Sequence, residues 1–125
     1  MPHPSEHTGP GEPLGREESE RIAEGMSAFT APSRVRLLYA LVDGELTVEA
    51  LAERAAVSGT VASQQLRVLR QLGAVAVRRE GRHAHYRLRD HHMGDLLAAV
   101  RHHVEHDPAA SSDAAPSPDE GEVPA

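Results

Sequence analysis

One stretch decides the fold: TVEALAERAAVSGTVASQQLRVLRQLGAVAVRREGRHAHYRLRD, residues 47–90. Its first half repeats apolar residues at helical spacing in two segments, 48–55 and 59–72, separated by a short turn. Thr47 and Ser58 precede the two segments, and a hydroxyl residue in that position predicts a helix N-cap. Two helices joined by so short a turn predict a helix-turn-helix, the second helix of which is the recognition helix.

The second half of the stretch changes from helical to extended periodicity. Residues 74–79 and 83–88 are short runs on either side of Glu80-Gly81-Arg82, a turn that contains glycine. This pattern predicts a β-hairpin. A hairpin that follows directly on a helix-turn-helix is typical of the wing of a winged helix.

Working outward, the apolar spacing predicts three more helices, at 17–29, at 32–42 and from 91 to about 105. The expected fold class is therefore mainly α with a β-hairpin wing, a winged helix-turn-helix. We place this domain at residues 16–107.

The two ends of the chain differ in composition from the predicted domain. Segment 1–15 is rich in proline and glycine, and segment 108–125 is acidic and has almost no large apolar side chains. Neither segment can bury enough apolar surface to offset the entropy of ordering. We expect a flexible N-terminal leader and a disordered acidic C-terminal tail.

The charge of the chain is unevenly distributed. The formal net charge is −6, yet residues 60–89 hold seven arginines and a single acidic residue, Glu80. A local excess of this kind attracts a polyanion. The chain has no cysteine, which excludes disulfides and thiolate metal sites. It has no apolar run of membrane-spanning length and no signal-peptide pattern, so we expect a cytoplasmic protein with no membrane partner.

The predicted recognition helix carries polar side chains opposite its expected core residues, which are Val61, Val68, Leu69 and Leu72. Glutamine can pair with adenine and arginine with guanine in the major groove, while hydroxyls reach bases or phosphates. Arginines on the hairpin can meet phosphates or an adjacent minor groove. Each such residue alone could be an ordinary solvated side chain, but the combination predicts binding to double-stranded DNA. The candidates are Thr60, Ser63, Gln64 and Arg67 on the helix and Arg78, Arg79, Arg82 and Arg87 on the hairpin.

Several of these segments resemble the ArsR/SmtB family of bacterial metal-responsive regulators. They are APSRVRLL at 31–38, SQQLRVLRQLG at 63–73, and REGR at 79–82 ahead of YRL at 86–88. The similarity covers roughly residues 20–107 and implies a homodimer whose first and last helices form the interface. Gln64 is a departure, because many members have histidine there, and it leaves the preferred operator bases open.

The last predicted helix is rich in histidine: five of the nine lie between 91 and 106. At about 100° per residue, His92, His103 and His106 form one stripe, but the first two are about 16 Å apart along the axis, too far for one ion to bridge. An antiparallel copy of the helix would bring Asp90 and His92 of one subunit beside His103 and His106 of the other. Twofold symmetry would then create two equivalent sites, each with three imidazoles and one carboxylate.

A competing set on the same helix is His91 with His102, which are also eleven positions apart. These two are expected to point away from the apolar stripe that should face the partner subunit. We therefore favour the first set and leave a contribution from the second open. The stripe consists of Met93, Leu96, Leu97, Val100 and Val104.

The resemblance implies the same choice of ligands, because the motif of the family's final helix is similar to Asp90-x-His92 and His103-x-x-His106. The family's other site, on the third helix, needs cysteine and cannot exist here. Members that sense nickel or cobalt add ligands from the N-terminal tail, which makes His3 a further candidate and leaves His7 open. We expect Ni²⁺ or Co²⁺, with tetrahedral Zn²⁺ as the alternative.

These features predict a metal-responsive, DNA-binding transcriptional regulator. The alternatives are a zinc-responsive repressor of the same fold and a winged-helix regulator with no metal response. An enzyme is disfavoured, since four protein ligands leave a tetrahedral ion no open position and nothing resembles a nucleophile with an oriented base. The operator, the target genes, the sign of the metal effect and any protein co-regulator are left open.

Overall fold

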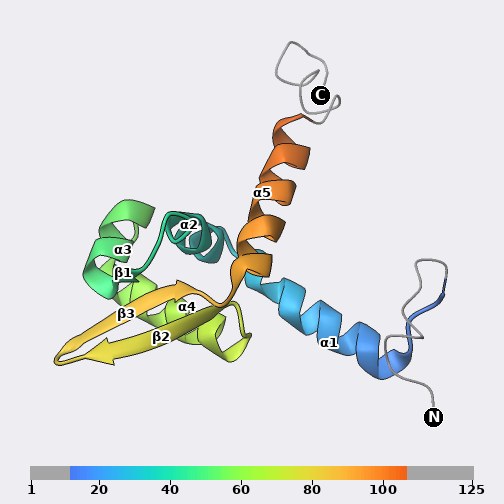
Figure 1. Cartoon of the computed structure of the whole chain (residues 1–125), viewed down its shortest axis with the longest axis horizontal. Coiled ribbons are helices and arrows are strands. Elements are labelled where there is room, and N and C mark those ends of the chain that lie inside the picture. The colour runs from blue at the N-terminus through green and yellow to red at the C-terminus, as the bar shows by residue number, and fades with distance from the viewer. Residues whose placement is uncertain (1–11, 107–125) are drawn as a thin grey trace.

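The computed structural model describes residues 12–106, and its elements follow the predicted order (Figure 1). The predicted leader and tail lie almost wholly outside these residues. In chain order, the elements are α1 (Arg16–Met26), the short 3-10 helix η2 (Ser27–Phe29), α2 (Pro32–Ala40), β1 (Leu46–Thr47), α3 (Val48–Ala55), α4 (Gly59–Gln71), β2 (Val75–Glu80), β3 (His83–Leu88) and α5 (His91–Glu105).

The helix-turn-helix is bounded by the two predicted caps. The Thr47 hydroxyl accepts a hydrogen bond from the amide of Ala50 at 3.2 Å, and the Ser58 hydroxyl accepts one from the amide of Val61 at 3.1 Å. Ala56 ends α3 in the left-handed region, at φ 60°, which turns the chain sharply into α4. The start of both helices of this motif was therefore readable from hydroxyl residues alone.

The wing is a three-stranded antiparallel sheet with strand order β1-β3-β2. Strand β1 was not predicted, because its two residues are too few to show a period. It pairs with β3 through Leu46 opposite Tyr86, and β2 pairs with β3 through Val77 opposite Tyr86. Partners across an antiparallel pair share one face, so these three side chains lie on the buried face of the sheet.

The core lies between α2, α3, α4 and the base of the sheet. Its largest fully buried side chains are leucines: Leu37, Leu38, Leu41, Leu51, Leu66, Leu69 and Leu97. The predicted core face of α4 was partly wrong. Leu69 is fully buried as predicted, but Val61, Val68 and Leu72 are only half-buried, because the buried face of the helix is centred on Leu66 with Ala62.

Helices α1 and α5 extend away from this core in different directions (Figure 1). The first helix is shorter than predicted and ends at Met26, and none of its residues is buried. Both helices carry exposed apolar side chains: Ile22, Met26, Leu96, Val100 and Val104 are 40–60% exposed. No helix among residues 12–106 combines the length and apolarity that a bilayer span needs.

Only part of the apolar stripe predicted for α5 packs against its own core. Leu97 was expected to face a partner subunit, but it is fully buried in its own subunit, and Met93 packs half-buried against the same core. Leu96 is about 100° from Leu97 around the helix, and Val100 and Val104 lie farther along it, where α5 extends beyond the core (Figure 1); all three remain exposed. This exposed part of α5 is free to pack against a second chain.

Candidate nucleic-acid interface and metal ligands

Helix α4 presents its predicted polar face to solvent, with Thr60, Ser63, Gln64 and Arg67 all exposed. The neighbouring Gln65 is half-buried instead, and its Oε1 accepts a hydrogen bond from Arg34 Nη1 at 2.8 Å. The same guanidinium donates to the carbonyl of Ser27 and the hydroxyl of Thr30, both at 3.0 Å. These hydrogen bonds tie α4 to the start of α2 while the polar face of α4 is turned toward solvent.

The pairing of the wing divides its predicted arginines between two faces. Arg79 lies opposite Ala84, on the same face as Tyr86 and toward the helices. Together with Arg67 and Arg70 of α4, it lines a pocket of about 260 Å³. Sequence reasoning missed Arg70, although its spacing of three from Arg67 was sufficient to place both on one side of the helix.

Arg78 lies on the opposite face of the wing, directly across from His85. Its Nη2 and Nε donate to the two carboxylate oxygens of Glu45 at 2.7 and 3.3 Å, and its Nη1 donates to Glu80 at 3.1 Å. The hydrogen bond from Arg78 lowers the pKa of Glu45, and the same bond raises the pKa of Arg78. The charge of this arginine is therefore already compensated within the protein.

The other two predicted wing residues, Arg82 and Arg87, are exposed as well. Arg82 lies at the hairpin turn, beside Gly81, whose φ of 61° closes the turn. Arg87 is on the Arg78 face, and its Nη1 donates to the carbonyls of Leu88 and Arg89 at 3.3 and 3.2 Å. Among the predicted wing contacts, Arg79 lines a pocket together with residues of the recognition helix.

The predicted metal ligands occupy the two ends of α5. At its start, Asp90 caps the helix by accepting the amide of Met93 at 3.1 Å, and its Oδ1 lies 3.8 Å from His92 Nδ1. At the other end, His106 Nδ1 donates to the carbonyl of His102 at 2.8 Å. This bond fixes the tautomer of His106 and leaves the Nε2 lone pair available to a metal ion.

A single chain does not bring the predicted ligands together. Within residues 12–106, no three histidine or carboxylate side chains are close enough to hold one metal ion. The competing histidines lie beside the predicted ones, since the ring of His91 is 4.0 Å from that of His92 and the ring of His102 stacks on that of His106 at 4.1 Å. His3 and His7 lie outside the described residues.

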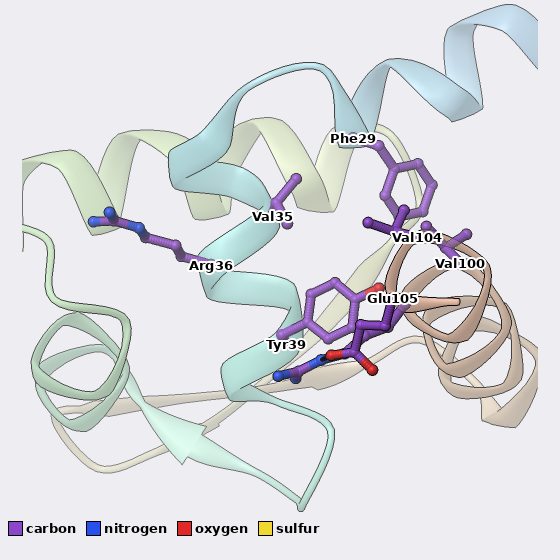
Figure 2. Close-up of a pocket in the computed structure, with 8 residues that line it drawn as sticks. Phe29, Val35, Arg36, Tyr39, Val100, Val104 and Glu105 are labelled. Carbon is purple, nitrogen blue, oxygen red and sulfur yellow. Dashed lines mark hydrogen bonds and ion pairs between the residues drawn. The ribbon is translucent and has the colours of Figure 1, made fainter. Parts of the chain in front are cut away.

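Helix α5 contacts α2, which in turn packs against α4. The hydroxyl of Tyr39 donates to the carbonyl of Leu97 at 2.7 Å, and the guanidinium of Arg101 lies 5.7 Å from the centre of the Tyr39 ring. Beside this contact is a pocket of about 490 Å³ (Figure 2). Phe29, Val35, Arg36 and Tyr39 line it from the η2–α2 side, and Val100, Arg101, Val104 and Glu105 line it from α5.

A helix-turn-helix with an exposed polar second helix, followed by an arginine-rich three-stranded wing, defines a winged-helix DNA-binding protein. Residues 31–77 match the family described as bacterial regulatory protein, arsR family. The chain is 39% identical over 108 residues to the HTH-type transcriptional regulator NmtR of Mycobacterium tuberculosis, covering 86% of this chain and 90% of that protein. The chain belongs to the ArsR/SmtB family.

Solved structures agree with this assignment. The solution structure of apo-NmtR superposes with a TM-score of 0.66 at 39% identity, covering 86% of this chain and 91% of that one. A homodimeric winged helix-turn-helix DNA-binding domain from Mycobacterium bovis superposes with a TM-score of 0.68 at 28% identity, covering 78% and 93%. The predicted family and fold class are confirmed, as is the prediction of a regulator rather than an enzyme.

Proposed function

We propose that this protein is a homodimeric transcriptional regulator that binds operator DNA through α4 and the wing and binds a metal ion between the α5 helices of its two subunits. The observation that carries the proposal is the position of the ligands. Asp90 with His92 and His103 with His106 lie at opposite ends of one exposed helix, and neither pair is sufficient alone.

The DNA-binding part rests on the exposed face of α4. Thr60, Ser63, Gln64 and Arg67 would read base edges and phosphates in the major groove. Arg79, Arg82 and Arg87 of the wing would add contacts to the backbone or the adjacent minor groove. Arg78, which the sequence pattern also predicts as a contact, is held by the carboxylates of Glu45 and Glu80.

The dimer is supported by the unpartnered apolar surface of the two projecting helices. Leu96 and Val100 on α5, together with Ile22 and Met26 on α1, are at least 40% exposed. Burying such side chains against a second copy contributes roughly 25 cal/mol per Å² of apolar surface removed from water. His92 and His103 are on the same side of α5 as Leu96 by helical spacing, so a second α5 on this surface would meet the histidines.

The donor set fits a divalent ion of intermediate softness. Three imidazoles and one carboxylate suit Ni²⁺, Co²⁺ or Zn²⁺ and do not favour ions that prefer thiolates. Bound there, the ion would tie together helices of two subunits. We propose nickel or cobalt, with His3 as an additional ligand because these ions take more than four, and zinc as the alternative.

Metal capture would be coupled to DNA binding through the angle between subunits. A ligand that binds one quaternary arrangement better shifts the population toward it, and the affinity for DNA changes by the same coupling free energy. Such couplings are typically about 1–3 kcal/mol. The decisive measurement is a DNA-binding titration at fixed salt in the presence and absence of each metal. Unchanged DNA affinity with Ni²⁺, Co²⁺ and Zn²⁺ would leave a winged-helix regulator with no metal response.

Calorimetry with Ni²⁺, Co²⁺ and Zn²⁺ tests which histidines bind the metal ion. Wild-type protein should bind one ion per chain, and His103→Ala should lose tight binding. The matched control is His102→Ala, which alters the neighbouring imidazole and should retain tight binding. The opposite result would assign the site to the His91 and His102 set.

A mixing experiment tests the sharing between subunits. His92→Ala and His103→Ala should each fail to bind metal tightly on their own. Their heterodimer, however, would combine an intact Asp90–His92 end from one chain with an intact His103–His106 end from the other. Tight binding should therefore reappear when the two variants are unfolded together and refolded, at half an ion per chain of heterodimer. A mixture that stays inactive would show that each site lies within one chain.

A further inference from the structure

We propose that the pocket between α4 and the wing, lined by Ser63, Arg67, Arg70 and Arg79, binds a backbone phosphate of the operator, and that Arg78 positions the wing without contacting DNA. We call this pocket the phosphate notch. The proposal rests on the DNA-binding function proposed above and assigns a role to Arg70, a residue that the recognition pattern of the sequence did not include.

The notch is assembled from two elements that are separate in the sequence. Ser63, Arg67 and Arg70 are spaced by four and three along α4, which places them on one side of the helix. Arg79 reaches the same place from β2, because its pairing with Ala84 puts it on the face of the wing that packs toward the helices. The resulting hollow measures about 260 Å³, and Val48, Ala84 and Tyr86 also line it.

The charge of the notch has one sign. Three of its lining residues are arginines, and none of the residues that line it is acidic. Guanidinium groups held together repel one another unless an anion lies between them, and their planar N–H forks match the oxygens of a phosphate. The hydroxyl of Ser63 adds a donor of the kind that commonly bonds phosphate oxygens. A backbone phosphate meets these requirements at the point where a duplex passes between the recognition helix and the wing.

The opposite face of the wing has a different arrangement. Glu45 immediately precedes β1, whereas Arg78 is on β2, and β3 lies between these strands. The bidentate ion pair therefore spans the sheet and ties its two outer strands together, at 2.7 and 3.3 Å. His85 on the central strand lies 3.9 Å from Glu45 and 3.7 Å from Glu80. A phosphate approaching Arg78 would have to displace two carboxylates, so this residue serves to hold the wing in position.

The salt dependence of DNA binding separates the two roles. Each phosphate contact contributes about −0.9 to the slope of log K against log salt concentration. Using an operator selected from a randomised duplex pool by the wild-type protein, we expect Arg70→Gln and Arg79→Gln each to reduce the magnitude of this slope by up to about 0.9, since both side chains hold the same phosphate. The matched control Arg78→Gln should leave the slope unchanged while weakening binding by a similar factor at every salt concentration.

Two results would overturn the proposal. One is a slope for Arg70→Gln equal to that of the wild type, and the other is a slope for Arg78→Gln reduced as much as that of Arg79→Gln. Arg70, Arg78 and Arg79 are all exposed, so the three variants should fold, and circular dichroism with thermal melting checks this. Failure of the wild-type protein to select any duplex would instead refute the DNA-binding function itself.

A separate titration distinguishes DNA phosphate from a free anion. Inorganic phosphate, added at constant ionic strength to protein without DNA, should show no saturable binding to the protein. A notch built for a small free anion would instead bind phosphate saturably and lose that binding in Arg70→Gln, which would also overturn the proposal.

Discussion

Replacing Tyr39 by phenylalanine tests whether the contact between α5 and α2 couples metal binding to DNA binding. The substitution removes one hydroxyl, and with it the 2.7 Å hydrogen bond that Tyr39 donates to the Leu97 carbonyl. That carbonyl has a second lone pair for its own helical partner, so it does not become unsatisfied. The expected cost is therefore that of one net hydrogen bond, about 1 kcal/mol of unfolding free energy.

The same bond should contribute to the effect of metal on DNA affinity. Tyr39 connects α5, which carries the proposed metal ligands, to α2, and α2 packs against α4 in the core. A bond that differs by about 1 kcal/mol between the metal-bound and metal-free arrangements would change the coupling factor about fivefold, since 1.4 kcal/mol corresponds to a factor of about ten. We expect Tyr39→Phe to bind DNA and metal separately with near wild-type affinity, but to show a metal effect on DNA binding reduced by up to about fivefold.

Fluorescence anisotropy with a labelled operator, with and without saturating metal, measures this coupling. The comparison variant is Tyr86→Phe, because the chain has only two tyrosines and this one is on β3, where it lines the phosphate notch. Its own DNA affinity is measured first, so that only the ratio of affinities with and without metal is compared. The control should retain the full metal effect. A Tyr39→Phe protein that is less stable but retains full coupling would refute the reasoning and leave the contact with a purely structural role.

Three further predictions concern stability. Leu97→Ala should lower the free energy of unfolding by about 3–5 kcal/mol in urea titrations, because Leu97 is the only buried residue of α5 and the smaller side chain leaves a cavity. A decrease below about 1 kcal/mol would mean that the packing of α5 does not depend on this contact. Ser58→Ala should cost about 1 kcal/mol by removing the cap of α4, whereas Ser58→Gly should cost only a few tenths; equal losses would contradict capping. The bond from Arg78 lowers the pKa of Glu45, so the ionised carboxylate stabilises the folded protein fully at pH values above the usual pKa of a carboxyl group. This stabilisation is lost as the pH falls through the lowered pKa. Melting temperatures of Glu45→Gln should accordingly decrease less on acidification than those of the wild type, and parallel curves would show that the pair contributes nothing to stability.

The sequence was informative where local chemistry determines the structure. Thr47 and Ser58 predicted the starts of α3 and α4 because an N-cap acts within its own helix turn. The hairpin was readable because residues 75–80 and 83–88 flank a glycine turn. Strand β1 could not be predicted, since a two-residue strand exists only through its pairing with β3.

The site was less predictable because it depends on contacts distant in the sequence. Periodicity identified the apolar stripe of α5 but could not show that Leu97 turns into its own core while Leu96 stays exposed. Composition likewise counted Arg78 and Arg79 as equivalent basic residues. The register of β2 against β3 places them on opposite faces, and Glu45, more than thirty residues before Arg78, neutralises only one of them.

The separation of ligands along α5 has a consequence for how much protein a cell must contain. If, as proposed, neither end of the helix holds an ion tightly alone, a chain diluted below its dimer dissociation constant would need more metal to respond, because binding must then also drive the association of two subunits. The metal concentration at which the protein responds would therefore depend on the amount of protein as well as on the ligands. A strain that makes less of this regulator would respond later, with every residue of the binding site intact.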